Sequence, residues 1–151
     1  LDLGFNYRID EVRSAIGLAQ LEELTDKNQR RSDLRLNYIR ILGNNNRISI
    51  PYRKVDRDSS NHIFPILLGE GINRKEIIEY LKKNGIQTSI HYPPVHLMTY
   101  FIDRFGVNQG NLKIAESIGR RELTLPLFDS MTTDQLEHVC EILNYALALD
   151  D

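Results

Sequence analysis

Residues 10 to 42 constrain the fold most, because one helical hydrophobic period runs through nearly all of them. Apolar side chains recur at intervals of three and four residues, and the run starts after Asp10, a suitable N-cap. It stops at Gly43, which three asparagines follow. We expect a break near residues 26–28. Since globular helices average about 11–12 residues, a helix of this length is predicted to bridge two bodies.

After residue 46, the sequence alternates between segments with a strand pattern and segments with a helix pattern. Residues 47–61 read as a polar loop with at most a short strand, and residues 62–68 as a strand that Pro65 moves toward a sheet edge. A helix should open at Asn73, which forms a capping box with Glu76, and end at Gly85. Residues 86–92 alternate with period two, which predicts a strand with one buried face.

The last third predicts a helix near residues 112–119, an extended segment over 123–127 and a final helix. Thr132 and Gln135 form the capping box of that final helix. Its core face should consist of Leu136, Val139, Cys140, Leu143 and Leu147. The order of elements predicts an α/β fold: a long N-terminal bridging helix and a small sheet covered by helices.

Composition and charge exclude several classes of function. The formal net charge of -2 gives no general attraction to nucleic acid or anionic lipid, and no stretch approaches the roughly 20 apolar residues of a membrane span. Cys140 is the single cysteine, which suits a reducing compartment and reads as a core residue. The four histidines lack metal-ligand spacing. We therefore expect a cytoplasmic protein without metal, nucleic-acid or membrane partners.

Two polar clusters are candidate binding sites. The first precedes the long helix, where Asn6, Tyr7 and Arg8 offer an amide, a phenol and a guanidinium suited to phosphate or sugar oxygens. The helix start could add a favourable dipole for an anion. The alternative is an ordinary turn with a solvated arginine.

The second cluster is His91 and Tyr92, which two prolines follow, with His96 nearby. A strand end that carries polar rings and then stops at prolines presents those rings on a rigid rim, and such rims often line pockets. A capped strand end with Tyr92 packed on a neighbouring helix explains the same pattern.

The sequence resembles the DegT/DnrJ/StrS sugar aminotransferases at a series of motifs in collinear order. The strongest are Gly4-Phe5-Asn6-Tyr7-Arg8, Ala15-Ile16-Gly17-Leu18-Ala19-Gln20-Leu21, Ser60-Asn61-His62-Ile63-Phe64, His91-Tyr92-Pro93-Pro94-Val95-His96-Leu97 and Leu125-Pro126-Leu127. The resemblance covers nearly the whole chain. It implies the C-terminal small domain of a fold-type-I transferase over residues 1–151, with a bridging helix at about 10–42.

The resemblance also implies an activity. Members of the family are homodimers that use pyridoxal phosphate (PLP) to move an amino group, usually from glutamate, to a keto sugar on a nucleotide diphosphate. A role in polysaccharide or cell-envelope biosynthesis is therefore expected. Asn6 matches a residue that reaches the PLP phosphate of the other subunit. Arg8, with Tyr7 as a companion, matches a position near the nucleotide diphosphate, and His91 and Tyr92 match the pair at the sugar-nucleotide end of the cleft.

The family's PLP-binding lysine precedes the Gly4–Arg8 motif, in a large N-terminal domain that this chain does not contain. The resemblance therefore implies no catalytic residue here, and the chain by itself is expected to be inactive. Two alternatives stay open: a PLP-dependent sugar dehydratase of the same family, in which a histidine replaces that lysine, and a free-standing, non-catalytic ligand-binding or dimerisation module.

Overall fold

A three-stranded antiparallel sheet stands at the centre of the fold. The computed structural model describes residues 4–5, 7–53 and 59–149. The sheet has the order β1-β2-β3, and β2 pairs with both neighbours. Its strands are β1 (Ile48–Ser49), β2 (Phe64–Leu68) and β3 (Glu122–Leu125). The predicted α/β class with a small, helix-covered sheet is confirmed.

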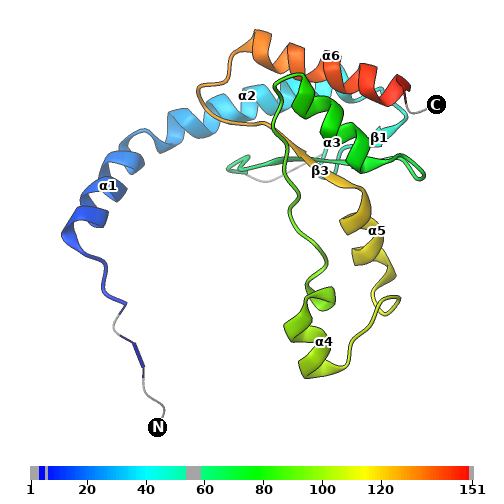
Figure 1. Ribbon diagram of the computed structural model, residues 1–151. Helices are drawn as coiled ribbons and strands as arrows, with labels where there is room; N and C mark the ends of the chain where they lie inside the picture. The colour runs from blue at the N-terminus through cyan, green and yellow to red at the C-terminus, as the bar shows by residue number, and fades with distance from the viewer. Residues whose placement is uncertain (1–3, 6, 54–58, 150–151) are drawn as a thin grey trace.

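Three helices lie together on one side of this sheet (Figure 1). They are α2 (Leu24–Leu42), α3 (Arg74–Lys83) and α6 (Thr133–Leu149), and α6 packs against both of the others. The predicted core face of the last helix is confirmed, with Ala146 added to it. Tyr38 joins the layers: it is fully buried and its ring stacks on Phe64 at 4.6 Å. The predicted capping box forms at Thr132, whose N–H donates to Gln135 and whose hydroxyl accepts the Gln135 N–H. Asn73 caps α3 by accepting the N–H of Lys75, and its side-chain amide donates to the Glu76 carboxylate.

The N-terminal helical run is two helices instead of one. Asp10 caps α1 (Glu11–Glu22) by accepting the N–H of Arg13 at 2.8 Å, as expected. The break falls at Glu23, before the predicted position, and α2 follows it. One turn after this break, the Lys27 ammonium contacts the Glu23 carboxylate at 2.7 Å and Asp129 at 3.9 Å, which joins the first turn of α2 to the segment before α6. None of the residues of α1 is buried, and α1 projects away from the body (Figure 1).

The prediction of a regular strand over residues 86–92 is wrong. The segment is extended, but a single bridge joins it to the sheet, through two backbone hydrogen bonds between Ser89 and Thr124. The ladder stops there because the next backbone N–H that faces β3, that of His91, donates to the side-chain carboxylate of Glu122 instead of a backbone carbonyl. The alternation of burial holds from Ile86 to Ile90 and is lost at Tyr92, which is 69% exposed.

Pro65 does not place its strand at an edge, since β2 is the central strand. Proline cannot donate a ladder hydrogen bond, and at position 65 the strand has no neighbour on one side among the described residues. β1 has only two residues and pairs with Leu67 and Leu68, so at Pro65 the strand has one neighbour, which is β3.

A limb formed by residues 93–121 extends from the sheet on the side opposite α6 (Figure 1). It contains the 3₁₀ turn Val95–Leu97, α4 (Thr99–Phe105) and α5 (Lys113–Arg121). α5 confirms the helix predicted near residues 112–119, whereas α4 was not predicted. Inside the limb, the buried His96 and Glu116 side chains meet with 3.0 Å between Nε2 and Oε1, and Glu116 also accepts the backbone N–H groups of Gly110 and Leu112.

The buried carboxylate should make the stability of the limb depend on acid. The hydrogen bond from His96, and then those from the two backbone N–H groups, lower the pKa of Glu116 below its ordinary value against the opposing effect of desolvation. A pKa that is lower in the folded chain stabilises the fold above the ordinary value of 4.5, and this contribution disappears as the pH falls through the folded value. The urea midpoint should therefore drop between about pH 5 and pH 3.

Glu116→Gln should flatten that pH dependence, because the titrating group is gone. Glu79→Gln is the matched control, since Glu79 is an exposed helix carboxylate paired with Lys75 at 3.9 Å. A Glu116→Gln profile that follows the wild-type and Glu79→Gln profiles would contradict this role.

Candidate functional site

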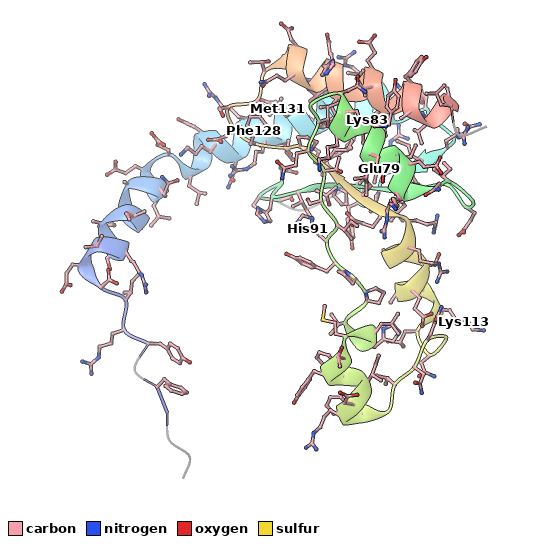
Figure 2. All side chains as sticks on the ribbon, viewed as in Figure 1. Glu79, Lys83, His91, Lys113, Phe128 and Met131 are labelled. Atoms are coloured by element: carbon pink, nitrogen blue, oxygen red, sulfur yellow. The ribbon has the colours of Figure 1, made fainter. Side chains whose placement is uncertain are left out.

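His91 lies where the extended segment leaves the sheet for the limb (Figure 2). Its Nδ1 atom is 3.0 Å from the Thr124 hydroxyl and 3.4 Å from the Ser89 hydroxyl. Its ring meets that of Tyr92 edge-on, with 4.9 Å between the centroids. In the part of the chain that the structure describes, no hydrogen bond engages Nε2 of His91. The described hydrogen bonds therefore hold the ring through Nδ1 and leave Nε2 unengaged.

Two buried polar residues of β3 hold His91 in place. Glu122 is 3% exposed and Thr124 is 5% exposed. The Thr124 hydroxyl donates to Oε1 of Glu122 at 2.5 Å, and Oε2 accepts the backbone N–H of His91 at 2.8 Å. Because Ser89 bridges to Thr124 in antiparallel register, His91 comes opposite Glu122. The result is a continuous hydrogen-bonded chain from a buried carboxylate to the imidazole.

Sequence reasoning missed Glu122 and Thr124. The signal was present, because Ser89 and His91 are polar residues two positions apart in one extended segment, and Glu122 and Thr124 are two apart in another. Polar pairs at this spacing share one face of each strand and can meet across a ladder.

The segment after Tyr92 is fixed by close packing on α5. A Cβ atom added to Gly119 would lie 2.6 Å from the ring carbons of Pro94, so glycine alone permits this approach. Arg74 then donates from Nη1 to the backbone carbonyls of Gly119 and Glu122, at 2.6 and 3.0 Å. Arg74 of α3 thus joins the end of α5 to the start of β3, where Glu122 also binds the backbone N–H of His91.

Tyr7 and Arg8 of the first predicted cluster lie on an exposed N-terminal arm, which we define as the described residues 4–5 and 7–10. Tyr7 is 86% exposed and Arg8 is also exposed, while Asn6 lies outside the described residues. The expected dipole site at the helix start finds no support, because the carboxylate of Asp10 already caps α1 and Glu11 adds a second negative group there.

The structure does not bring the two clusters together. The arm and the limb extend from the body toward the same side but stay apart (Figure 1). Tyr7 and Arg8 therefore share no site with His91 and Tyr92 within a single copy of this chain. The roles assigned to these four residues and to Asn6 remain predictions.

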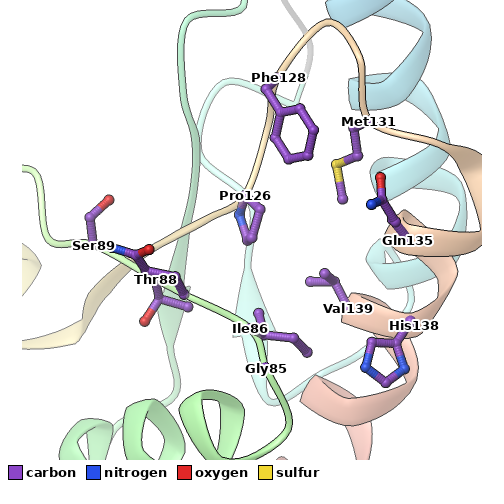
Figure 3. A pocket seen from close by; sticks show the side chains of 11 residues that line it. Gly85, Ile86, Thr88, Ser89, Pro126, Phe128, Met131, Gln135, His138 and Val139 are labelled. Atoms are coloured by element: carbon purple, nitrogen blue, oxygen red, sulfur yellow. The ribbon is translucent and has the colours of Figure 1, made fainter.

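A cavity of about 480 Å³ opens between the extended segment 85–89 and the first turns of α6 (Figure 3). Its lining is mixed: Ile86, Phe128, Met131 and Val139 are apolar, and polar side chains also line it, namely Gln87, Thr88, Ser89, Gln135 and His138. Among the described residues, those that line it include no lysine or arginine, the cations that bind phosphate most strongly, and none of the predicted site residues.

The described residues contain no group of three or more His, Cys, Asp or Glu side chains that could hold a metal ion. None of the helices in the described segments is long and apolar enough to cross a membrane. Cys140 is buried in the core, where desolvation raises its pKa to about 12, so it packs as a hydrophobe.

The sequence as a whole decides the family. Residues 1–144 match the DegT/DnrJ/EryC1/StrS aminotransferase family. The chain belongs to this family. The match runs through both the N-terminal arm and the His91–Tyr92 segment, so the two clusters are elements of one family pattern.

Individual DegT-family relatives agree in sequence and in fold. A UDP-4-amino-4,6-dideoxy-N-acetyl-beta-L-altrosamine transaminase from Helicobacter pylori is 31% identical over 91% of this chain and 36% of its own length. The solved structure of the H. pylori aminotransferase PseC superposes with a TM-score of 0.91 at 28% identity, over 99% of this chain and 40% of that one. A putative sugar aminotransferase from Streptococcus pneumoniae, solved in its PLP form, superposes with a TM-score of 0.86 at 26% identity, over 95% of this chain and 37% of that one.

The chain is short compared with these relatives. It spans about 36% of the length of the curated proteins that it matches. The superposition nevertheless extends along almost all of this chain, including the projecting arm and α1. The arrangement of arm, body and limb is therefore the arrangement that these residues adopt in solved aminotransferases.

Proposed function

We propose that this chain forms the C-terminal domain of a PLP-dependent aminotransferase that transfers an amino group from an amino acid such as glutamate to a nucleotide-linked keto sugar. The observation that carries the proposal is the superposition on PseC, an aminotransferase of pseudoaminic acid biosynthesis, over 99% of the chain. The related transaminase from the same organism is named for a UDP-linked amino sugar, and we take the substrate class from it.

The residues present suit one part of a cofactor site. Bound PLP supplies the electron sink that allows the amino group to move. In this chain Arg8, with Asn6, would contact phosphate groups, because a guanidinium and an amide are good donors to phosphate oxygens. No residue of this chain is assigned to hold the cofactor covalently. The lysine that does so would belong to the N-terminal domain.

The exposed arm and α1 support a homodimer as part of the proposal. Phe5, Ile9, Val12, Ile16 and Leu21 are large apolar side chains and all are more than half exposed. Such a concentration of apolar surface normally packs against another protein surface. We propose that the N-terminal domain and the second subunit cover it, which brings Arg8 of one subunit toward the cleft of the other. The lone, buried cysteine agrees with a cytoplasmic enzyme.

Substitution of the arm in the longer enzyme tests this function. Arg8→Ala should weaken binding of the sugar nucleotide by about 10- to 100-fold, since a hydrogen bond to a charged group contributes about 1.5–3 kcal/mol. Asn6→Ala should weaken retention of PLP. Both are measured by titration of the purified enzyme, with UDP-sugar and with PLP.

Arg13→Ala is the matched control for Arg8→Ala. Arg13 is an exposed arginine on α1 that pairs with Asp10 at 3.4 Å, and its removal should leave both affinities unchanged. If Arg8→Ala and Arg13→Ala behave alike, the assignment of the arm to the site is wrong.

A further inference from the structure

We infer that Glu122 and Thr124 are positioning residues that fix the tautomer of His91, so that Nδ1 carries the proton and Nε2 accepts a hydrogen bond from a hydroxyl of the sugar nucleotide. This inference deepens the proposed function and rests on it for the identity of the ligand. The tautomer itself follows from the hydrogen-bond chain and needs no ligand.

The hydrogen bonds that link Glu122, Thr124 and His91 have one consistent direction of donation. Oε2 of Glu122 accepts the backbone N–H of His91, and an ionised carboxylate has no hydrogen to give. Oε1 therefore accepts the hydrogen of the Thr124 hydroxyl, at 2.5 Å. A hydroxyl has a single hydrogen, so the oxygen of Thr124 can only accept from the imidazole.

That acceptor faces Nδ1 of His91 at 3.0 Å, so Nδ1 must be the protonated nitrogen. Ser89 is compatible with this state, because its hydroxyl, 3.4 Å away, can also accept. In the neutral ring Nε2 then has a free lone pair. Since Nε2 is the nitrogen that the buried chain leaves unengaged, His91 offers an acceptor to the ligand and not a donor.

Burial makes this arrangement selective. Glu122 and Thr124 are almost fully enclosed, so water cannot take the place of either partner without cost. Arg74 holds the backbone carbonyl of Glu122, which keeps the start of β3 opposite His91. The acceptor should therefore favour sugars with a hydroxyl at the position that Nε2 faces over deoxy sugars at that position.

Glu122→Gln gives a sharp test. The amide matches the carboxylate in shape, but it reverses the direction in which the hydrogen bonds between residue 122, Thr124 and His91 are donated. Its oxygen must face the N–H of His91, so its NH₂ group must face Thr124. The Thr124 hydroxyl then accepts from the amide and donates to Nδ1, which forces the proton of His91 onto Nε2. Thr124→Ser keeps the hydroxyl and is the matched control.

The tautomer is read by ¹⁵N NMR of the histidine-labelled chain at about pH 8.5, where an ordinary imidazole is neutral, with His91→Gln to identify the His91 signals. We expect a protonated Nδ1 in the wild type and in Thr124→Ser, and a protonated Nε2 in Glu122→Gln. A wild-type ring protonated on Nε2 overturns the inference, even if Glu122→Gln fails to fold. A folded Glu122→Gln chain that keeps the proton on Nδ1 overturns it as well.

Kinetics of the longer enzyme separate this inference from the proposed function. Glu122→Gln should raise KM for the sugar nucleotide about tenfold, and Thr124→Ser should retain the wild-type value. If the tautomers are as expected but KM is unchanged, the role of Nε2 toward the ligand is wrong. If the wild-type enzyme transfers no amino group to any sugar nucleotide, the proposed function fails while the NMR result stands.

Discussion

Tyr38→Ala should lower the free energy of unfolding of this chain by about 3–5 kcal/mol, as expected for removal of a large aromatic side chain from a core. Tyr38 is fully buried between layers that come from distant parts of the sequence. Its ring stacks on Phe64 of β2, and its hydroxyl donates to the carbonyl of Pro126 at 2.9 Å, just after β3. Urea unfolding followed by circular dichroism measures the change.

Tyr38→Phe separates the ring from the hydroxyl. It keeps the stack on Phe64 and leaves the Pro126 carbonyl without its donor, which should cost about 1–2 kcal/mol. Burial raises the pKa of Tyr38 well above its ordinary value, so the hydroxyl stays protonated and donating across the usual pH range. Equal losses in Tyr38→Ala and Tyr38→Phe would show that the ring does not join the layers as described.

Gly119→Ala should disrupt the His91–Tyr92 segment and so reduce both stability and activity. The new methyl group would lie 2.6 Å from Cγ and Cδ of Pro94, and a proline ring cannot rotate away. Overpacking of this kind costs about 1–3 kcal/mol. Because a displacement of about 1 Å in a site can cost about a hundredfold in rate, kcat/KM of the longer enzyme should fall by about that factor.

Gly17→Ala is the matched control, since Gly17 is also a helical glycine. A Cβ atom there meets nothing within 4 Å, so alanine should stabilise α1 by up to about 1 kcal/mol through its helix propensity. The same propensity favours alanine at position 119, so a net loss of stability there isolates the clash with Pro94. Two substitutions with the same small effect would contradict the close packing of Pro94 on α5.

The sequence predicted the elements that local chemistry defines. The cap at Asn73 and the capping box at Thr132 set the starts of α3 and α6, and the helical period along α6 identified its buried face. The break at Glu23 was predicted too late in the chain, because no glycine or proline near it marks the end of the first helix.

The strand over residues 86–92 failed for a similar reason. Period-two alternation was present, but a side chain from β3 intercepts the N–H of His91 and ends the ladder. The sequence predicted His91 and Tyr92 as polar rings on a rigid rim before two prolines, and in the structure Tyr92 is exposed while His91 is partly buried. The spacing of Glu122 and Thr124 was a signal of a polar pair, but the register between Ser89 and Thr124 that places Glu122 opposite His91 is fixed only in the folded sheet.

The most direct test of the central claim is the visible absorbance of lysine-bound PLP, recorded after PLP is added to the 151-residue chain and to the longer enzyme of which we propose it is a part. The account predicts the band in the longer enzyme and none in the chain alone. A band of full intensity in the isolated chain, or no band in the longer enzyme, would contradict it.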